Sequence, residues 1–161
     1  MRLAPLAILP KGALAILKEI GRHVLRRPVV GIAAAARTPD GRWLLIRRAD
    51  TGTWALPGGT LEWGETLRAA LTRELAEEAG VDASAIVRLV GVYSRPDRDP
   101  RFHGVTIVVE CAIDAPVRPA SNPLEIREVR LFAPDAIPES LAMGMEDMLA
   151  AAMRREPPVV E

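Results

Sequence analysis

The first part of the chain alternates between apolar runs and turn-forming residues in the manner of a β-hairpin. Residues 29–37 (VVGIAAAAR) make a continuous apolar run of strand length. The turn sequence TPDG follows at 38–41, and residues 42–48 (RWLLIRR) return as a second strand. Residues 49–59 then read as a loop with a short extended piece at 54–56. This stretch therefore predicts two paired strands followed by a loop.

Two later segments have the composition of helices. Residues 65–79 contain neither Gly nor Pro and are rich in Leu, Ala and Glu, and Gly80 is a natural C-terminal stop. An apolar stripe on this helix is expected to dock on a sheet: Leu67, Leu71, Leu75 and Ala79. A last helix is predicted at roughly 140–155, and the sequence PPVVE after it is expected to fray.

Three further strands complete the pattern, at about 86–94, 104–113 and 125–132. The first two are separated by a charged, proline-punctuated loop at 95–103. The order β-β-α-β-β-β-α predicts an α/β fold in which a mixed sheet is covered by helices on both faces. A length of 161 residues fits one domain, which we expect at 29–155 with a C-terminal tail at 156–161.

Residues 1–28 are predicted to form a helical extension before this domain. Apolar residues recur there at helical spacing, namely Ala13, Ile16, Leu17, Ile20 and Val24. Two interpretations stay open: the helix packs on the domain or on a second subunit, as in a homodimer, or it lies on a membrane surface. Pro5 and Pro10 interrupt the apolar start, no run approaches the ~18 apolar residues of a membrane span, and no secretory signal is expected.

Charge and cysteine content narrow the class of partner and the compartment. The chain has 21 Lys and Arg against 21 Asp and Glu, so its formal net charge is zero. It therefore has no overall attraction for nucleic acid or anionic membrane, and no nucleic-acid partner is expected. Cys111 is the one cysteine and lies in an apolar run, which fits a buried thiol, a reducing compartment and a cytoplasmic location.

The helix predicted at 65–79 crowds three carboxylates onto one face. Glu74, Glu77 and Glu78 stand at i, i+3 and i+4, within about 100° of arc, at the edge of the apolar stripe. In a half-buried cleft they would raise one another's pKa values, a cost that a divalent cation removes. Oxygen ligands favour Mg²⁺ or Mn²⁺. The alternative is that the acidic face is merely solvated.

The surroundings of these carboxylates favour the metal site. Arg73 can pair with Glu65 or Glu77 and so orient the acidic face. The pair Gly58-Gly59 lets the backbone approach closely, where a carbonyl oxygen can act as a further ligand. Together these residues predict a cation at a loop–helix junction, ready to receive a phosphate group.

The spacing of the same residues forms a longer motif. It reads Gly59, five residues, Glu65, seven residues, Arg73-Glu74-Leu75, one residue, Glu77-Glu78, one residue, Gly80-Val81. This is a complete Nudix box, and the chain therefore resembles the Nudix hydrolase family. The expected element order also agrees with the Nudix-type α/β/α sandwich.

The resemblance implies an enzyme that uses a divalent metal to hydrolyse a nucleoside diphosphate linked to another group. By matching position, Glu74 and Glu78 look like the principal metal ligands and Glu77 like an additional one. The carbonyl of Gly58 looks like a backbone ligand, and Glu65 and Arg73 like the pair that orients Glu74. The family usually adds a later carboxylate, as metal ligand or base. Here the candidates are Glu125, which we prefer for its place near a loop, and Glu128.

The substrate is indicated less directly. The Arg-Asp-Pro-Arg core of the 95–103 loop resembles the ADP-ribose pyrophosphatase-like branch of the family. Six basic side chains are candidates for binding phosphate groups: Arg47, Arg48, Arg95, Arg98, Arg101 and His103. The loop could instead be solvated, with its aspartates balancing the charge. We therefore expect an enzyme that hydrolyses ADP-ribose or a nucleoside diphosphate sugar. Two alternatives stay open: a nucleoside triphosphate pyrophosphohydrolase, including one for oxidised nucleotides, and a non-catalytic nucleotide-sensing module.

Overall fold

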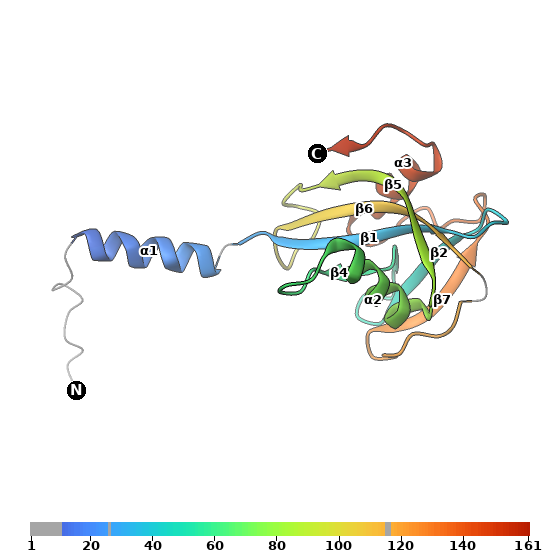
Figure 1. Ribbon diagram of the computed structural model, residues 1–161, viewed down its shortest axis with the longest axis horizontal. Coiled ribbons are helices and arrows are strands. Elements are labelled where there is room, and N and C mark those ends of the chain that lie inside the picture. The colour runs from blue at the N-terminus through green and yellow to red at the C-terminus, as the bar shows by residue number, and fades with distance from the viewer. Residues whose placement is uncertain (1–10, 26, 115–116) are drawn as a thin grey trace.

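The computed structural model describes residues 11–25, 27–114 and 117–161. Its elements follow one another in the order α1 (Lys11–Leu25), β1 (Val29–Arg37), β2 (Trp43–Arg48), β3 (Trp54–Ala55), β4 (Gly58–Thr60), α2 (Leu67–Ala79), β5 (Ser84–Tyr93), β6 (Gly104–Ile113), β7 (Ile126–Phe132), the 3₁₀ helix η2 (Ala142–Gly144), α3 (Met145–Met153) and β8 (Val159–Val160). Figure 1 shows the strands gathered into one curved sheet, with α2 and α3 on different sides of it.

The sheet is mixed and has eight strands. Its main path runs β3-β2-β1-β6-β5-β8, with β4 paired to β1 and β7 paired to β2. The pairs β1–β6 and β5–β8 are parallel, and the pairs β1–β2, β2–β7 and β5–β6 are antiparallel. The predicted α/β class with a mixed sheet is confirmed.

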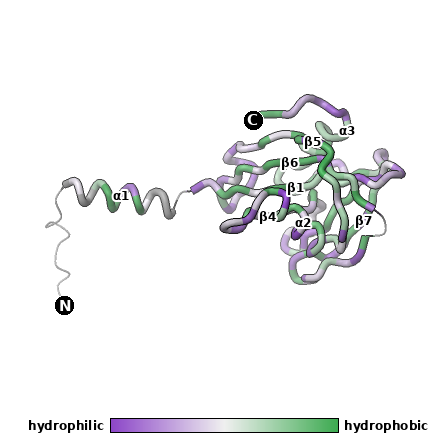
Figure 2. The backbone as a smooth tube through the Cα atoms, in the orientation of Figure 1, coloured by the Kyte–Doolittle hydropathy of each residue, from purple (hydrophilic) through white to green (hydrophobic). Residues whose placement is uncertain are grey.

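Two apolar cores lie on the two faces of the sheet, because successive strand residues point to opposite sides. Along β1, Ala33 and Ala35 face the core that holds α3, whereas Ile32 and Ala34 face the core that holds α2. The hydropathy colouring of Figure 2 shows these central strands as largely apolar. The α/β/α layering predicted from the sequence therefore follows from the strand alternation.

The helix of the acidic motif begins two residues later than predicted. Thr66 is its N-cap and accepts a hydrogen bond from the Ala69 N–H (3.2 Å). Leu67 is 37% exposed, and Ala70 joins Leu71 and Leu75 in the buried face. This start places the second half of α2, which carries the carboxylates, beside β4.

The last helix is shorter than predicted and is interrupted at its start. Met143 (φ 59°) and Gly144 (φ 66°) both adopt left-handed backbone conformations, so η2 and α3 do not form one continuous helix. The residues after α3 also correct a prediction. The sequence PPVVE does not fray, because β8 pairs in parallel with β5 through Gly91↔Val159 and Val92↔Val160.

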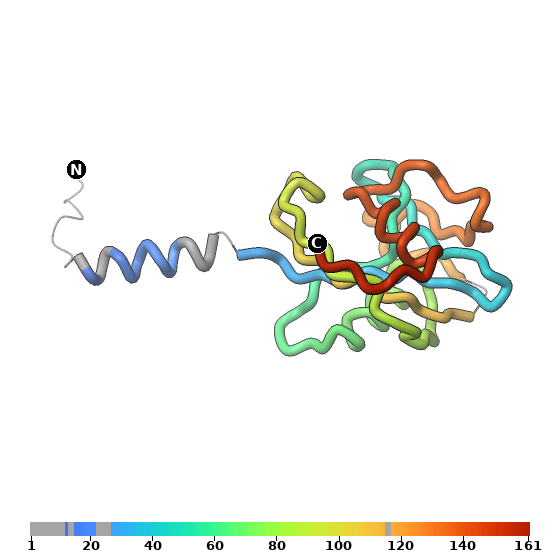
Figure 3. The backbone as a smooth tube through the Cα atoms, turned by 90° about the horizontal axis from the view of Figure 1, so that it is seen from above, coloured from blue at the N-terminus to red at the C-terminus, as the bar shows by residue number. Residues whose placement is uncertain are grey.

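The N-terminal helix α1 stands apart from the sheet in two perpendicular views (Figures 1 and 3). Ile16, Leu17 and Ile20 are 62%, 49% and 54% exposed, so the expected packing of this apolar stripe on the domain is not observed. Packing on a second subunit stays a prediction. Within the described residues, no helix has the length and apolar character needed to cross a membrane.

Candidate active site

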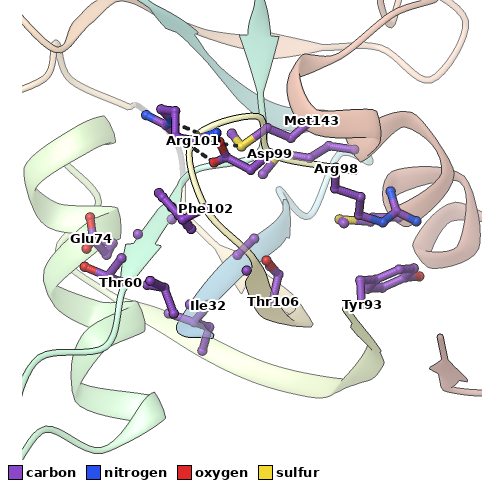
Figure 4. Close-up of a pocket in the computed structure, with 18 of the residues that line it drawn as sticks. Ile32, Thr60, Glu74, Tyr93, Arg98, Asp99, Arg101, Phe102, Thr106 and Met143 are labelled. Carbon is purple, nitrogen blue, oxygen red and sulfur yellow. Dashed lines mark hydrogen bonds and ion pairs between the residues drawn. The ribbon is translucent and has the colours of Figure 1, made fainter. Parts of the chain in front are cut away.

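A cavity of ≈ 290 Å³ lies between α2, the central strands, the loop after β5 and the start of α3. Figure 4 shows Glu74 and Thr60 on one side of it and Tyr93 with Arg98 on the other, with Asp99 nearby. The cavity thus receives carboxylates from the acidic motif and basic side chains from the charged loop. Segments far apart in the sequence meet here.

Close backbone packing brings β4 against β1 at one edge of this cavity. Gly31, Ile32 and Ala33 pair with Thr60, Gly59 and Gly58. A Cβ atom on Gly58 would lie 2.1 Å from the Ile32 carbonyl oxygen, and one on Gly59 would lie 2.2 Å from Glu74 Oε1. Both distances are far below van der Waals contact. At position 58 the obstacle is backbone, so only glycine fits there, whereas a larger residue at position 59 would push the Glu74 carboxylate out of its place. The tight approach expected from the sequence is therefore present.

Arg73 holds the carboxylates around the start of the acidic helix. Its Nε donates to Glu65 Oε1 (3.0 Å) and its Nη2 to Glu65 Oε2 (3.1 Å). Its Nη1 donates to Glu74 Oε1 (2.8 Å) and reaches Glu77 Oε2 at 3.5 Å, while Nη2 also donates to the Thr60 carbonyl (3.3 Å). The hydrogen bond from Arg73 is the main cause that lowers the pKa of Glu65. The arginine therefore fixes Glu74 relative to both the loop and the helix.

Glu74 and Glu78 are the buried carboxylates of the site. They are 9% and 7% exposed, and the Gly58 N–H donates to Glu78 Oε2 (2.7 Å). Burial is the largest cause that raises the pKa of Glu74, against the opposing effect of Arg73. Burial, reinforced by the negative charges of Glu74 and Glu125, raises the pKa of Glu78 to about 8 even though the Gly58 hydrogen bond acts in the opposite direction. The fold thus forces two acidic groups into a cleft that disfavours their charge.

The unfavourable burial of these two carboxylates is the observation that indicates a metal site. Hard oxygen ligands whose charged forms are unfavourable fit a divalent cation, which would stabilise them as carboxylates. As placed, the described His, Cys, Asp and Glu side chains form no group of three around a possible ion position. Glu77 points to the exposed side, with 58% of its side chain accessible. The residues that fit the ion best are therefore Glu74 and Glu78, beside the Gly58 backbone.

The two candidates for the later carboxylate lie in different surroundings. Glu125 lines the cavity together with Glu74 and Glu78, and its charge contributes to the raised pKa of both. Glu128 instead forms ion pairs with Arg130 and, at 3.8 Å, with Arg47. The structure thus brings Glu125, and not Glu128, to the buried carboxylates.

Two of the six basic candidates, Arg48 and Arg101, line the cavity and present guanidinium groups that a ligand can reach. Arg48 lines it and pairs with Asp50 (2.7 Å). Arg101 lines it as well, and its side chain is 51% exposed. Asp99, which sequence reasoning missed as a site residue, accepts hydrogen bonds from Arg101 Nε (2.9 Å) and Nη2 (2.7 Å). Asp99 is 8% exposed, so its buried carboxylate holds the Arg101 guanidinium in a fixed orientation.

The remaining basic candidates are engaged elsewhere. Arg98 lines the cavity, but its side chain is 8% exposed and pairs with Asp147 and Glu161. Three others are absent from the lining of this cavity. Arg47 donates to the Gly52 carbonyl (2.9 Å), Arg95 to Asp97 (2.8 Å), and His103 Nε2 lies 2.7 Å from the Ser94 carbonyl oxygen. Strand alternation explains why Arg48 faces the cavity and its neighbour in β2 does not.

An apolar wall completes the cavity, and the sequence carried no clear signal for it. Met143, Met145 and Met148 reach it from η2 and α3, and Phe102 reaches it from the charged loop. Methionine side chains adapt to flat, polarisable groups. Their position depends on the left-handed residues before α3, and those conformations are not readable from residue types alone.

The fold and site together define a class of protein. An α/β/α sandwich that presents buried carboxylates and arginines to one cavity is suited to hydrolysis at phosphate groups. A family model described as the NUDIX domain matches residues 25–152. The chain belongs to the NUDIX domain family, and the membership inferred from the box at 59–81 is confirmed.

Similar proteins agree on the family and carry different names. An ADP-ribose pyrophosphatase from Methanocaldococcus jannaschii is 49% identical over 72 residues, which are 43% of this chain and 42% of that protein. The match thus spans less than half of that relative's length. A MutT-like protein from Streptomyces ambofaciens is 38% identical over 113 residues, 70% of this chain and 69% of that protein. The crystal structure of a MutT NUDIX hydrolase from Burkholderia pseudomallei has a TM-score of 0.65 at 32% identity and covers 78% of this chain and 98% of that chain.

Proposed function

We propose that this protein uses Mg²⁺ or Mn²⁺ to hydrolyse the phosphoanhydride bond of a nucleoside diphosphate linked to another group, with ADP-ribose or a nucleoside diphosphate sugar as substrate. The observation that carries the proposal is the meeting, in one cavity, of the buried pair Glu74 and Glu78 with the arginines Arg48 and Arg101. Carboxylates suit a cation, and arginine forks suit phosphate oxygens. A pyrophosphate held between them would contact both.

The carboxylate side of the cavity would carry the chemistry. Hydrolysis forms a bond between a water oxygen and one phosphorus, breaks the bridging P–O bond, and releases a proton and the second phosphate. A divalent cation, when bound, supplies charge neutralisation and a more acidic water. Glu74 and Glu78 would hold it with the Gly58 carbonyl, with Glu77 as an outer ligand, and Arg73 with Glu65 would keep Glu74 in orientation. Glu125 faces the same space and could accept the proton.

The arginine side would bind the substrate. Arg101 is held in place by Asp99, which leaves its remaining N–H groups for a phosphate. Arg48 stands beside the same cavity. The name of the Methanocaldococcus relative supports ADP-ribose as the first compound to test. We also propose that the substrate is a free nucleotide and not a nucleic acid, and that the protein acts in the cytoplasm.

The direct experiment is a product analysis with ADP-ribose and MgCl₂. We expect AMP and ribose 5-phosphate in equal amounts, no products with EDTA, and recovery of activity when MgCl₂ or MnCl₂ is added back. A parallel reaction uses dGTP and an oxidised form of it. Faster turnover of the triphosphates, with pyrophosphate released, would replace the proposal by nucleoside triphosphate pyrophosphohydrolase activity.

The same samples test the non-catalytic alternative. If ADP-ribose binds in a calorimetric titration but no nucleotide is hydrolysed with either metal, the protein is a nucleotide-sensing module. A pair of buried carboxylates that disfavour their own charge argues against that outcome, since a pure binder gains nothing from them.

A further inference from the structure

The Arg98 side chain connects three segments that are distant in the sequence, at the wall of the cavity. Its Nε and Nη2 donate to the two carboxylate oxygens of Glu161 (2.9 and 2.5 Å). Its Nη1 and Nη2 donate to Asp147 on α3 (3.2 and 2.7 Å), and Nη1 also donates to the Gly144 carbonyl (2.9 Å). The guanidinium also stacks over the Tyr93 ring at 5.1 Å. A buried arginine is therefore matched by two carboxylates from segments on either side of it.

Glu161 makes a second set of contacts at the start of the charged loop. Its Oε2 accepts hydrogen bonds from the backbone N–H groups of Ser94 (3.0 Å) and Arg95 (2.9 Å). The Ser94 hydroxyl donates to the Glu161 carbonyl (3.0 Å), and the Glu161 N–H donates to the Val92 carbonyl (3.0 Å). Figures 1 and 3 both place the C-terminal strand alongside β5, where this loop begins. One side chain thus holds both the backbone and the Arg98 side chain of the loop.

The segments joined in this way carry the substrate side of the cavity. Asp99 and Arg101 stand one and three residues after Arg98 in the loop, and both line the cavity. Met143, in the left-handed conformation, precedes the Gly144 carbonyl that Arg98 binds, and its sulfur lies 3.9 Å from Arg101 Nη2 at the cavity wall. The distance between the arginine fork and the methionine wall therefore depends on what holds Arg98.

We propose that Glu161 is a positioning residue for substrate recognition. By joining the Ser94–Arg95 backbone to Arg98, it sets the spacing between Arg101 and the wall formed by Met143, Met145 and Met148, and so determines how tightly the nucleotide is held. The choice of ligand rests on the proposed function, whereas the structural role does not. Glu161 touches no reacting group in this scheme, so its loss should weaken binding more than chemistry.

The test compares Glu161→Gln with wild type and with a matched control. Glutamine keeps the size of the side chain but replaces one acceptor oxygen by a donor that faces the N–H groups of Arg98 or of the loop. Glu156→Gln is the control, because it removes the same charge from a residue outside the Arg98 cluster. Glu156 lies three residues after α3 and pairs with Arg154 on the surface. We expect KM for ADP-ribose to rise about 3- to 10-fold in Glu161→Gln with kcat within about two-fold of wild type. Glu156→Gln should match wild type in both.

Amide hydrogen exchange gives a readout that needs no substrate. The Ser94 and Arg95 amides should exchange about 10-fold faster in Glu161→Gln, while amides of α2 keep their wild-type rates. Glu161→Asp keeps the charge on a shorter side chain, so its exchange rates at Ser94 and Arg95 should lie between those of wild type and Glu161→Gln. It serves as the second variant if glutamine unfolds the protein at the assay temperature.

Three results would overturn the inference. Unchanged exchange at Ser94 and Arg95 would show that the contacts with Glu161 do not hold the loop. Faster exchange with unchanged KM, or with kcat lowered as much as kcat/KM, would show that the contacts do not position substrate. If wild type hydrolyses no nucleotide, the proposed function fails by itself, and the Kd for ADP-ribose takes the place of KM in this comparison.

Discussion

Two arginines gather carboxylates on different sides of the cavity, over very different lengths of chain. Arg73 binds Glu65, Glu74 and Glu77, which lie eight, one and four residues away. Arg98 binds Asp147 and Glu161, which lie 49 and 63 residues away. The first cluster is built mainly by the period of a single helix. The second exists only after the whole sheet has formed.

The two clusters also differ in the charge state that they favour. Around Arg73, burial raises the pKa of Glu74, and the neighbouring Glu78 has its pKa raised to about 8. Around Arg98, hydrogen bonds from its guanidinium lower the pKa of Glu161 to about 2. Burial thus disfavours the charged forms of Glu74 and Glu78, whereas Arg98 stabilises the charged form of Glu161. We conclude that the first arrangement favours binding an ion and the second favours holding the fold.

The largest expected effect comes from Glu78→Gln. Loss of this carboxylate should lower kcat for the preferred nucleotide by on the order of 10²-fold or more, because a metal ligand is removed. The thermal midpoint of the metal-free protein at pH 7 should stay close to wild type, since a carboxyl group with a pKa of about 8 is mostly protonated there and glutamine resembles it. Steady-state kinetics and calorimetry with EDTA measure both. The exposed Glu139→Gln is the control, and equal activity of Glu78→Gln and wild type would contradict the metal role.

A smaller effect is expected from Arg73→Lys. A lysine cannot make the two parallel contacts to Glu65 while also reaching Glu74, so Glu74 loses its orientation. Activity should fall about 10- to 100-fold, with part of it restored by higher Mg²⁺. Arg68→Lys, on the exposed side of the same helix, is the matched control. If both variants lose activity equally, the orienting role of Arg73 is wrong.

The smallest effect concerns the pH dependence of stability at the second cluster. The folded-state pKa of Glu161 is about 2, below its ordinary value of 4.5, so its contribution is present above that ordinary value and is lost as pH falls toward 2. The difference in urea midpoint between wild type and Glu161→Gln should therefore be largest near neutral pH and shrink between pH 4.5 and 2. Chemical denaturation at a series of pH values measures it. A difference that does not change with pH would show that Glu161 acts through packing and not through charge.

The contrast between a cluster formed by neighbouring residues and one formed by distant segments explains which features could be predicted from the sequence. The spacing of Glu74, Glu77 and Glu78 places them on one helical face whatever surrounds them, and alternation along β2 allows one of Arg47 and Arg48 to face inward. These relations are local, so residue types and periods are enough to predict them. The mixed sheet, its covering helices and the neighbourhood of the buried carboxylates could be anticipated for that reason.

What could not be anticipated depends on contacts between distant segments. The sequence PPVVE gives no sign that it will become β8, because its pairing with Gly91 and Val92 needs an open edge that β5 provides only in the folded sheet. The sequence suggested Arg98 as a phosphate ligand because it gives no sign of the two partners that Arg98 has in the fold, Asp147 on α3 and Glu161 directly after β8. The interruption at Met143 and Gly144 is likewise a tertiary effect, since methionine has no preference for left-handed backbone.

The packing of β4 against β1 has a consequence for engineering. Every residue other than glycine carries a Cβ atom, and at positions 58 and 59 that atom would collide with the Ile32 carbonyl or the Glu74 carboxylate. Variant libraries aimed at a new substrate should therefore keep both glycines fixed. Met145 and Met148 line the same cavity from a regular helix on the other face of the sheet from α2. Both are buried in the apolar core, so libraries can vary the shape of these side chains but should keep them apolar.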